Sequence, residues 1–356
     1  MSPCNVLVVG GSRHGGNSTG LARGFRELGH AVVLLGVDRY LPSIDRSPVA
    51  RGLGRLLMPV LRRRFNQAIV ETVEAFRPEV VVLCKGAYVL PATLARIRSR
   101  AWVANFFPDN SFLAHRGLDP EIFPHCDHIF STKRFGVADF EAYLGRQGNV
   151  TFLPHGYDPQ THRPFSDARL LEPWACDVSF IGTWSPRKEQ LLSRLRAALE
   201  PGQLRIWGYL WHRRRDRELD SCIVGHGIVG DPYALAISGS TINLGLLSER
   251  RTGAGDDDQI TSRTFHIPAS GGFLLHQRTA ELAEYFEEGR EVACFASAEE
   301  LVDKVKYYLA HEAERRRIAR AGYERCIAGN RLSRRAQVIL DTYRAGRAAA
   351  PRTPSG

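Results

Sequence analysis

The chain has 356 residues, of which 44% are hydrophobic and 24% are charged, a balance typical of a globular protein with room for two domains. The formal net charge of +10 favours an anionic partner, but no nucleic-acid-binding motif accompanies it, so we expect no nucleic-acid partner. The seven scattered cysteines form no CxxC pair, which argues against a disulfide framework and a zinc site. With no signal-peptide pattern and no apolar run of 18 residues, we expect a cytoplasmic protein.

The first part of the chain alternates between strand and helix patterns. Continuous apolar runs such as NVLVV, from Asn5, are typical of parallel strands buried on both faces. We predict strands at 5–9, 31–35, 78–84, 101–107, 128–131 and 150–153, and helices at 19–28, 53–76, 90–98 and 135–143. Pro59 is expected to break or kink the second helix. The alternation predicts a Rossmann-like domain over residues 1–165.

In the beginning of the long second helix, residues 53–65, basic and apolar residues alternate. One interpretation is a solvated helix that packs on its own sheet. The other is a face that contacts an anionic membrane, which would place the protein at the inner face of the membrane. The sequence leaves both open.

Candidate ligand-binding groups follow two of these strands. Gly10 and Gly11 end the first strand, and His14 stands in the loop behind them. Asp109 follows the strand at 101–107. Open α/β sheets bind ligands at the carboxyl ends of their strands, so these residues could line a cleft. The alternatives are a tight turn for the glycines and a turn or helix cap for Asp109.

The strand and helix patterns begin again after residue 175. We predict strands at 176–181, 204–207, 223–226, 241–244 and 272–275, and helices from about 186 and at 299–310, 313–329 and 331–343. This predicts a second Rossmann-like domain over residues 166–330, followed by a helix at 331–346 and a disordered tail at 347–356.

The stretch DQITSRTFHIPASGGF, residues 258–273, combines Arg263 with the glycine pair Gly271 and Gly272. We interpret the stretch as a helix start beside a close backbone approach. Paired glycines, a helix N-terminus and an arginine together suit a diphosphate. The run Asp256–Asp258 could instead hold a metal, but we expect a loop there and no metal site.

The segments RTFHIPASGG, FFPDN, LPHGYDPQTHRP and VSFIGTWSPRKEQLL resemble the CgeB-like (spore-maturation-type) glycosyltransferases. The resemblance covers most of residues 75–330 and is most specific from Arg263 to Arg325. It implies an α/β GT-B fold, with two Rossmann-like domains facing across a cleft and a C-terminal helix that crosses back to the first domain. It also implies sugar transfer from a nucleotide-diphosphate sugar to an acceptor hydroxyl, without a metal or another cofactor.

The chain departs from the pattern of related GT-B enzymes at one important position. Enzymes of this fold that retain configuration have two acidic residues eight positions apart, for the donor sugar and its ribose. Asp258 and His266 stand at these positions. A histidine can form a hydrogen bond to ribose but offers no fixed negative charge. If the roles correspond, replacing His266 with glutamate is expected to strengthen donor binding.

The implied chemistry assigns roles to further residues. Negative charge grows on the departing diphosphate, so cations and backbone N–H groups must face it. The donor-binding candidates are Gly182, Arg187, Lys188, Asp258, Arg263, His266, Gly271 and Gly272. An inverting enzyme also needs a base at the acceptor hydroxyl, for which Asp109, His155 and His14 are the candidates in that order. Retaining chemistry would leave Asp109 as an acceptor-binding group.

Two other functions remain open at this stage. The chain could be a catalytically silent protein of the same fold that binds nucleotide sugars, which His266 favours. It could also be a Rossmann-type NAD(P) oxidoreductase, for which Asp38 at the end of the second strand is the one supporting feature. The absence of a GxGxxG motif weighs against the second alternative.

Overall fold

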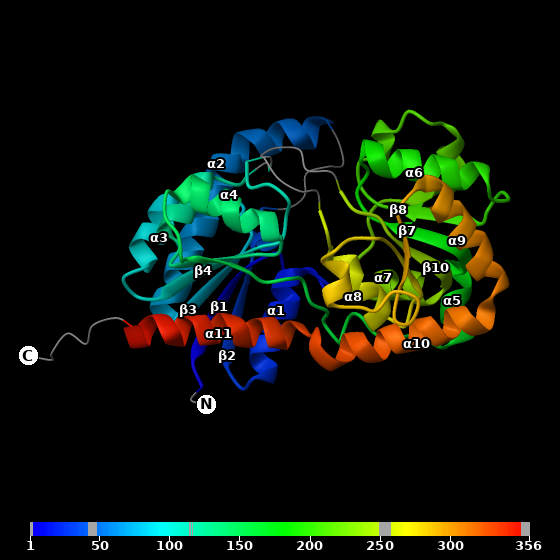
Figure 1. Ribbon diagram of the computed structural model, residues 1–356. Helices are drawn as coiled ribbons and strands as arrows, with labels where there is room; N and C mark the ends of the chain where they lie inside the picture. Colours follow the sequence, from blue (N-terminus) through cyan, green and yellow to red (C-terminus); the bar gives the residue numbers. More distant parts are fainter. Residues whose placement is uncertain (1–2, 42–47, 114, 116, 249–257, 350–356) are drawn as a thin grey trace, which may run out of the picture. The chain divides into compact units, whose positions relative to one another are not determined.

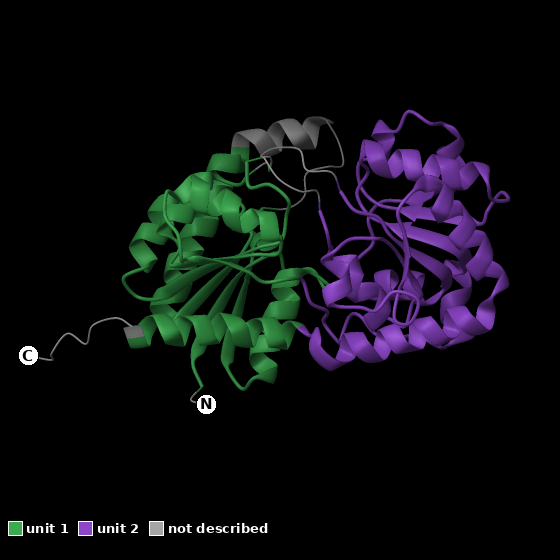
Figure 2. Cartoon of the chain, in the orientation of Figure 1, with its two compact units in different colours: residues 1–154, 332–356 green, residues 155–331 purple. Residues whose placement is uncertain are grey.

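The computed structural model consists of two compact units, which Figure 2 shows in different colours. Unit 1 comprises residues 1–154 and 332–356, and unit 2 comprises residues 155–331. The structure describes residues 3–41, 48–113, 115, 117–248 and 258–349.

Unit 1 is built around a six-stranded parallel sheet in the order β2-β1-β3-β4-β5-β6 (Figure 1). Its strands are β1 (Asn5–Gly10), β2 (Ala31–Gly36), β3 (Val80–Cys84), β4 (Trp102–Phe107), β5 (His128–Ser131) and β6 (Val150–Phe152). Its α-helices are α1 (Asn17–Glu27), α2 (Pro48–Phe76), α3 (Pro91–Ile97), α4 (Arg134–Leu144) and α11 (Leu332–Ala349). Single 3₁₀ turns lie at Val37–Arg39 and Pro120–His125.

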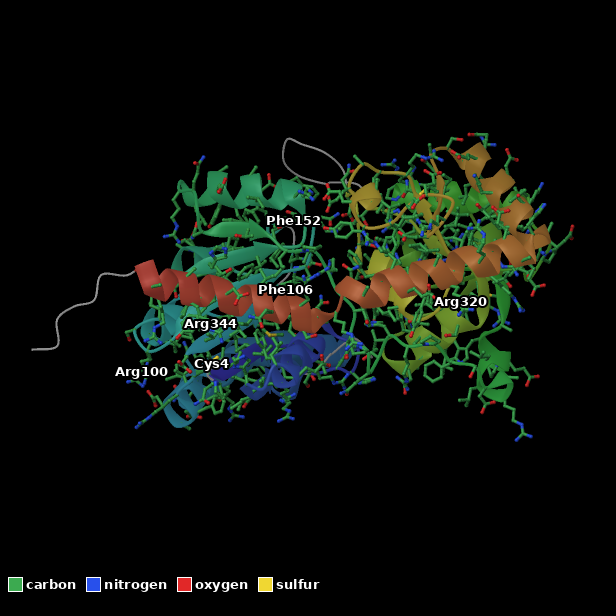
Figure 3. All side chains as sticks on the ribbon, turned by 60° about the horizontal axis from the view of Figure 1, so that its bottom comes forward. Cys4, Arg100, Phe106, Phe152, Arg320 and Arg344 are labelled. Atoms are coloured by element: carbon green, nitrogen blue, oxygen red, sulfur yellow. The ribbon has the colours of Figure 1, made fainter. Side chains whose placement is uncertain are left out.

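Alternate residues of these strands enter two separate cores. Leu7 and Val81 belong to the core that also contains Phe65 of α2. Val8 and Phe106, the latter labelled in Figure 3, belong to the core shared with α1 and α11. Each central strand is therefore buried on both faces, which explains its continuous apolar sequence.

The C-terminal helix α11 packs against α1, as the resemblance implied. They approach each other closely at Gly24, where a Cβ atom would lie 2.8 Å from the backbone nitrogen of Ser333. α11 reaches Ala349, and residues 350–356 of the expected disordered tail lie outside the described residues.

α2 runs through Pro59 without a break, so of the expected break or kink the break is wrong. Proline removes one backbone hydrogen bond, and the turns that follow are anchored to the core by Phe65 and Ile69. Leu57 and Val60 are about half exposed on this helix. Its contact with an anionic membrane stays a prediction. Within the described residues, no helix is long and apolar enough to cross a membrane.

His128, at the start of β5, makes unit 1 sensitive to acid. Its ring is 8% exposed, with Nε2 2.8 Å from the hydroxyl of Thr151. Burial lowers the pKa of His128 to about 4, below its unfolded value of about 6.5. Protonation therefore favours the unfolded chain. The contribution of the neutral ring is complete above about pH 6.5 and is lost as the pH falls towards 4.

We expect acidification from pH 7 to 4 to remove about 3 kcal/mol of unfolding free energy through this one histidine. Urea unfolding of the wild type and of His128→Gln, followed across this pH range, tests the expectation. The variant should lose less stability on acidification, whatever its stability at pH 7. Equal pH slopes for the two proteins would contradict it.

Unit 2 contains a second six-stranded parallel sheet, in the order β12-β11-β10-β7-β8-β9. Its strands are β7 (Cys176–Ile181), β8 (Leu204–Trp207), β9 (Ile223–Gly225), β10 (Ser240–Gly245), β11 (Leu274–Gln277) and β12 (Ala293–Phe295). Its α-helices are α5 (Ala168–Leu171), α6 (Pro186–Ala197), α7 (Asp231–Ser238), α8 (Ser262–Ala269), α9 (Ala298–Ala310) and α10 (Glu312–Gly329). Single 3₁₀ turns lie at Glu172–Trp174, Trp211–Arg213, Glu218–Cys222 and Leu282–Glu284.

Candidate functional site

The order of strands in unit 2 marks where a ligand would bind. The chain builds β7, β8 and β9 outward in one direction, then returns to place β10 on the other side of β7. The connections leave the carboxyl ends of β7 and β10 in opposite directions. Such a switch point opens a crevice at the carboxyl edge of the sheet, where α/β proteins bind ligands.

Arg263 links the loops at this switch point. One guanidinium nitrogen donates to the carbonyl of Ile181, at the end of β7, at 3.3 Å. The other donates to the carbonyl of Leu246, just after β10, at 2.7 Å. Its Nε is buried, and none of the described residues forms a hydrogen bond with it. Burial lowers the pKa of Arg263, opposed by the nearby Tyr233 and Asp258. The guanidinium is thus a cation held mainly by backbone carbonyls.

Lys188 of α6 joins the same two loops. Its ammonium donates to the carbonyl of Thr183, after β7, at 3.1 Å and to the hydroxyl of Ser248, after β10, at 2.6 Å. The side chain is almost completely buried. The neighbouring Arg187 is exposed. Two cations, Lys188 and Arg263, are therefore fixed at one edge of the sheet.

Gly182 follows β7 and leaves space for the guanidinium. A Cβ atom there would lie 3.0 Å from Nη1 of Arg263 and 2.7 Å from the Phe180 ring. Asp258 is buried just ahead of α8, and its charge acts on Arg263. The structure therefore brings Gly182, Lys188, Asp258 and Arg263 to the carboxyl edge of the sheet in unit 2.

The glycine pair lies elsewhere than expected. α8 starts after Thr261, whose side chain forms a capping box with Thr264, and it ends before Gly271. The amide of Gly271 donates to Pro268 and that of Gly272 to Ile267. The stretch does contain the expected helix start, at Ser262, but the expectation that the glycine pair offers backbone N–H groups is wrong, because both amides are engaged at the C-terminal end of α8.

Local packing explains why glycine is needed at both positions. Gly271 has a φ of +75°, the left-handed conformation common just after a helix. A Cβ atom on Gly272 would lie 2.6 Å from the side chain of Ile237 and 2.8 Å from that of Asn243. The pair therefore lets α8 pack closely on α7 and β10.

His266 lies in the middle of α8, in a closed environment. Its Nε2 is 3.1 Å from the carbonyl of Gly156, so this nitrogen carries the proton and donates. The ring stacks on His162 with the centroids 3.7 Å apart, and Tyr233 meets it edge-on. Burial, followed by the charge of His162, lowers the pKa of His266 well below its ordinary value. His266 is thus a neutral ring within the packing of unit 2.

In unit 1, Asp109 follows β4 but is already engaged. One of its oxygens, Oδ2, is 2.7 Å from the ammonium of Lys85 and 3.3 Å from Nε2 of His115. Sequence reasoning gave neither partner a role. The signal for Lys85 was available, because it follows β3 directly at the same edge of the sheet. His115 carried no such signal, since it lies in a loop six residues after Asp109.

The remaining candidates are spread over both units. His14 is exposed, and its Nδ1 is 2.9 Å from the guanidinium of Arg23. Gly10 ends β1, where a Cβ atom would lie 2.2 Å from the hydroxyl of Ser18, while Gly11 is exposed. His155 is buried at the first residue of unit 2.

The sequence also suggested Asp38 as a feature of an NAD(P) site and the run Asp256–Asp258 as a metal site. Both carboxylate oxygens of Asp38 accept hydrogen bonds from Ser12, one of them from its backbone N–H at 2.6 Å. Asp256 and Asp257 lie outside the described residues. Among the residues that the structure describes, no group of histidine, cysteine and acidic side chains could hold a metal.

Residues 187–341 match a protein-family model described as "Glycosyl transferase-like". This segment includes Lys188, Asp258, Arg263 and His266. No curated protein sequence matches the chain.

Among solved structures, sucrose-phosphate synthase from Thermosynechococcus elongatus is similar, with a TM-score of 0.65 and 15% identity over 98% of this chain and 100% of that one. AviGT4, a glycosyltransferase involved in avilamycin A biosynthesis, has a TM-score of 0.60 and 19% identity over 98% and 99% of the two chains. HepE from Anabaena, solved in complex with UDP-glucose, has a TM-score of 0.61 and 11% identity over 96% and 100%. The chain therefore has the GT-B fold, with two parallel six-stranded sheets.

Proposed function

We propose that this protein is a glycosyltransferase that moves a sugar from a nucleotide-diphosphate sugar to an acceptor hydroxyl. The observation that supports the proposal most strongly is the pair of fixed cations, Lys188 and Arg263, at the switch point of unit 2. The match of residues 187–341 to a glycosyltransferase-like family includes both residues.

The chemistry of transfer fits this arrangement. The bond between the anomeric carbon and the diphosphate oxygen breaks, and its electron pair stays on the diphosphate. The acceptor oxygen bonds to that carbon and loses its proton. The cations Lys188 and Arg263, with the exposed Arg187, would stabilise the departing diphosphate, in a transfer that we propose to be metal-independent. Because they are fixed before the reaction, little reorganisation is needed as charge develops.

The other roles follow from position. Asp258, buried beside Arg263, is proposed to face the donor sugar, and Gly182 to give the diphosphate close access to the backbone. For the acceptor proton we propose Asp109, then His155 and His14, as implied by the resemblance. Membership of the CgeB-like subfamily belongs to the same proposal, which names neither the sugar nor the nucleotide base.

A second candidate is a nucleotide-sugar-binding protein without turnover. The specific observation in its favour is that His266 occupies the position of an acid and already bonds to Gly156. Release of free nucleotide from any bound donor would exclude this candidate.

Titration with nucleoside diphosphates tests the proposal. UDP, GDP, TDP and ADP are added in turn and followed by calorimetry and thermal shift. We expect at least one to bind, and at 100 times its Kd it should stabilise the folded protein by about 2.7 kcal/mol. The matching monophosphate should bind more weakly, because it lacks the phosphate that the two cations would contact. Neither heat nor a thermal shift with any of the four would contradict the proposal.

A further inference from the structure

Three side chains in unit 1 contact one another at the carboxyl ends of β3 and β4. The ammonium of Lys85 is 2.7 Å from Oδ2 of Asp109 and 3.2 Å from Nδ1 of His115. Nε2 of His115 is 3.3 Å from the same Oδ2. Each of the three side chains is about 30% exposed. The cluster is therefore ordered by its own contacts and open to a ligand.

The donors and acceptors of this cluster fix its protonation state. An ammonium can only donate, so Nδ1 of His115 accepts from Lys85, and Nε2 carries the proton that faces Asp109. Burial lowers the pKa of His115. The charge of Asp109 opposes this shift, and the charge of Lys85 adds to it. The cluster thus combines a cation, an anion and a neutral ring, and has no net charge.

One donor and one acceptor of the cluster remain available. Both contacts to Asp109 fall on Oδ2, and no described residue donates to Oδ1. Lys85 has three N–H groups, of which the described residues engage two. The site can therefore accept a hydrogen bond at Oδ1 and donate one from Lys85, which are the two bonds that a hydroxyl, or two adjacent hydroxyls, can complete.

The backbone holds Lys85 in an unfavourable conformation to make this cluster. Its φ is +72°, the left-handed region that residues with a Cβ atom rarely adopt. The buried Asn105 donates to the carbonyl of Lys85 at 3.2 Å, and the amide of Lys85 donates to Phe106 at 2.9 Å. Strain that the surroundings enforce is typical of functional sites.

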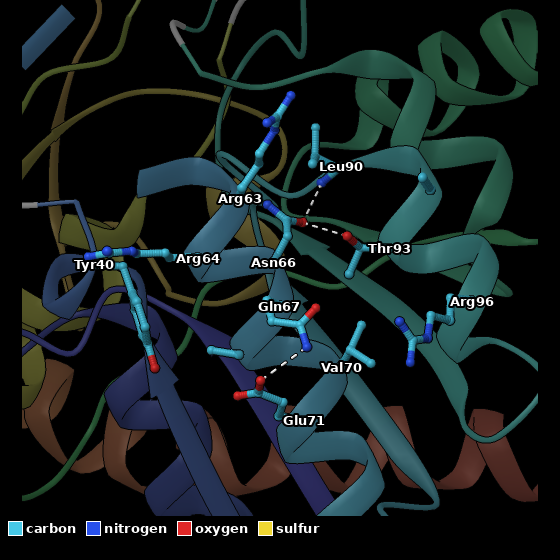
Figure 4. A pocket seen from close by; sticks show the side chains of 12 residues that line it. Tyr40, Arg63, Arg64, Asn66, Gln67, Val70, Glu71, Leu90, Thr93 and Arg96 are labelled. Atoms are coloured by element: carbon cyan, nitrogen blue, oxygen red, sulfur yellow. Dashed lines mark hydrogen bonds between the residues drawn. The ribbon is translucent and has the colours of Figure 1, made fainter. Parts of the chain in front are cut away.

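α2 fixes the other end of the same loop. Tyr88 also has a positive φ, of +65°, and its carbonyl accepts from both Arg62 and Asn66. Figure 4 shows Asn66 in the wall of a cavity of about 780 Å³ beside α2 and α3, with its hydrogen bonds to Leu90 and Thr93. Two elements therefore hold the loop from Lys85 to Tyr88 from opposite ends.

We propose that Lys85, Asp109 and His115 form the subsite that binds and orients the acceptor, and that the acceptor is an uncharged polyhydroxylated molecule at this point. The proposal rests on the proposed glycosyl transfer. Asp109 accepts a hydrogen bond from the reacting hydroxyl and Lys85 donates one to it or to its neighbour. His115 acts through Asp109 and is a positioning residue. A charge-balanced site gives a phosphate or carboxylate no net attraction, which favours a neutral carbohydrate.

The nucleotide titration first identifies a donor that binds. Failure of the proposed glycosyl transfer is thereby distinguished from failure of the acceptor subsite. Transfer is then followed by mass spectrometry with two acceptor sets, neutral nitrophenyl glycosides and sugar phosphates. Release of nucleotide with water as the acceptor is measured in parallel. The variants are Lys85→Gly, whose φ of +72° suits glycine and so preserves folding, Lys85→Arg, and His115→Gln. Arg96→Met is the matched control, because it removes a cation from an ion pair with Glu74 on α2.

We expect neutral glycosides to be the acceptors. In Lys85→Gly the acceptor KM should rise about ten- to hundred-fold, the effect of losing a hydrogen bond to a charged group, while the donor KM stays within twofold. Lys85→Arg should recover part of the loss, and His115→Gln should have a smaller effect in the same direction. Arg96→Met should behave like the wild type. If water is the sole acceptor used, nucleotide release should fall in Lys85→Gly at unchanged donor affinity.

Three results would overturn the proposal. The first is preferential use of sugar phosphates by the wild type. The second is a change of donor KM, rather than acceptor KM, in Lys85→Gly. The third is that Lys85→Gly, with intact donor binding, transfers the sugar or releases nucleotide to water at the same rate as the wild type.

Discussion

Replacing Arg263 with alanine is expected to lower kcat/KM for the nucleotide sugar by about 100- to 1,000-fold, the loss found when one fixed donor is removed from a developing negative charge. The expectation follows from the surroundings of the guanidinium. It spans the carbonyls of Ile181 and Leu246 across the switch point, and its buried Nε meets no hydrogen-bond partner in the part of the chain that the structure describes. Steady-state kinetics with the donor that binds, together with the Kd of its nucleoside diphosphate, measure the loss.

The same substitution also removes two hydrogen bonds within unit 2, so its structural cost must be measured separately. We expect a loss of about 1–3 kcal/mol in unfolding free energy from the carbonyls left unpaired, which leaves a protein of ordinary stability folded. Arg263→Lys keeps the charge but cannot reach both carbonyls, and should recover part of kcat/KM. Arg320→Ala, on the exposed face of α10 and paired with Glu324, is the control. Wild-type kcat/KM in a folded Arg263→Ala protein would contradict the assigned role.

The sheets could be predicted from the sequence because their central strands are buried on both faces. Runs such as VVVLC in β3 carry enough apolar surface to indicate a strand without knowledge of their neighbours. β12 has three residues and pairs with β11 alone, and α7 has eight residues. Both were missed, because segments so short have almost no periodicity to detect.

Residues of the candidate site could be predicted from the sequence where they lie at strand ends and helix starts. The prediction failed where the contacts join residues far apart in the sequence. Arg263 and Lys188 could be proposed from the sequence because a cation at the start of a predicted helix is visible there, and the structure places both at the carboxyl edge of the sheet of unit 2. The glycine pair was expected to offer backbone N–H groups, because a glycine after a helix and one before a helix look alike until the capping residues are known. Nothing local indicated that His115 would meet Asp109, or that His266 would stack on His162.

His266→Glu is expected to destabilise unit 2, whereas the resemblance implied that this substitution would strengthen donor binding. The native ring donates to the carbonyl of Gly156 and packs face to face on His162. An ionised carboxylate at this position would face a carbonyl oxygen and could not donate to it. A buried charge without a partner costs about 3–5 kcal/mol, so thermal and urea unfolding should show a large loss.

Two further features of the experiment separate this explanation from a simple packing defect. His266→Gln keeps an N–H group for the carbonyl of Gly156 and should cost no more than about 1–2 kcal/mol. The unfolding free energy should also depend on pH with opposite signs for His266 in the wild type and for the carboxyl group in His266→Glu. In the wild type, the lowered pKa of His266 means that its contribution is complete above about pH 6.5 and is lost as the pH falls.

The introduced carboxyl group would behave in the other direction. Burial raises its folded pKa above the unfolded value of about 4.3, so its penalty is absent at low pH and grows as the pH rises through that folded pKa. The stability difference between wild type and His266→Glu should therefore widen from pH 4 to pH 8. An unchanged Tm together with tighter nucleoside diphosphate binding would show instead that position 266 faces the ribose, the role that the resemblance implied for the second of the two acidic positions.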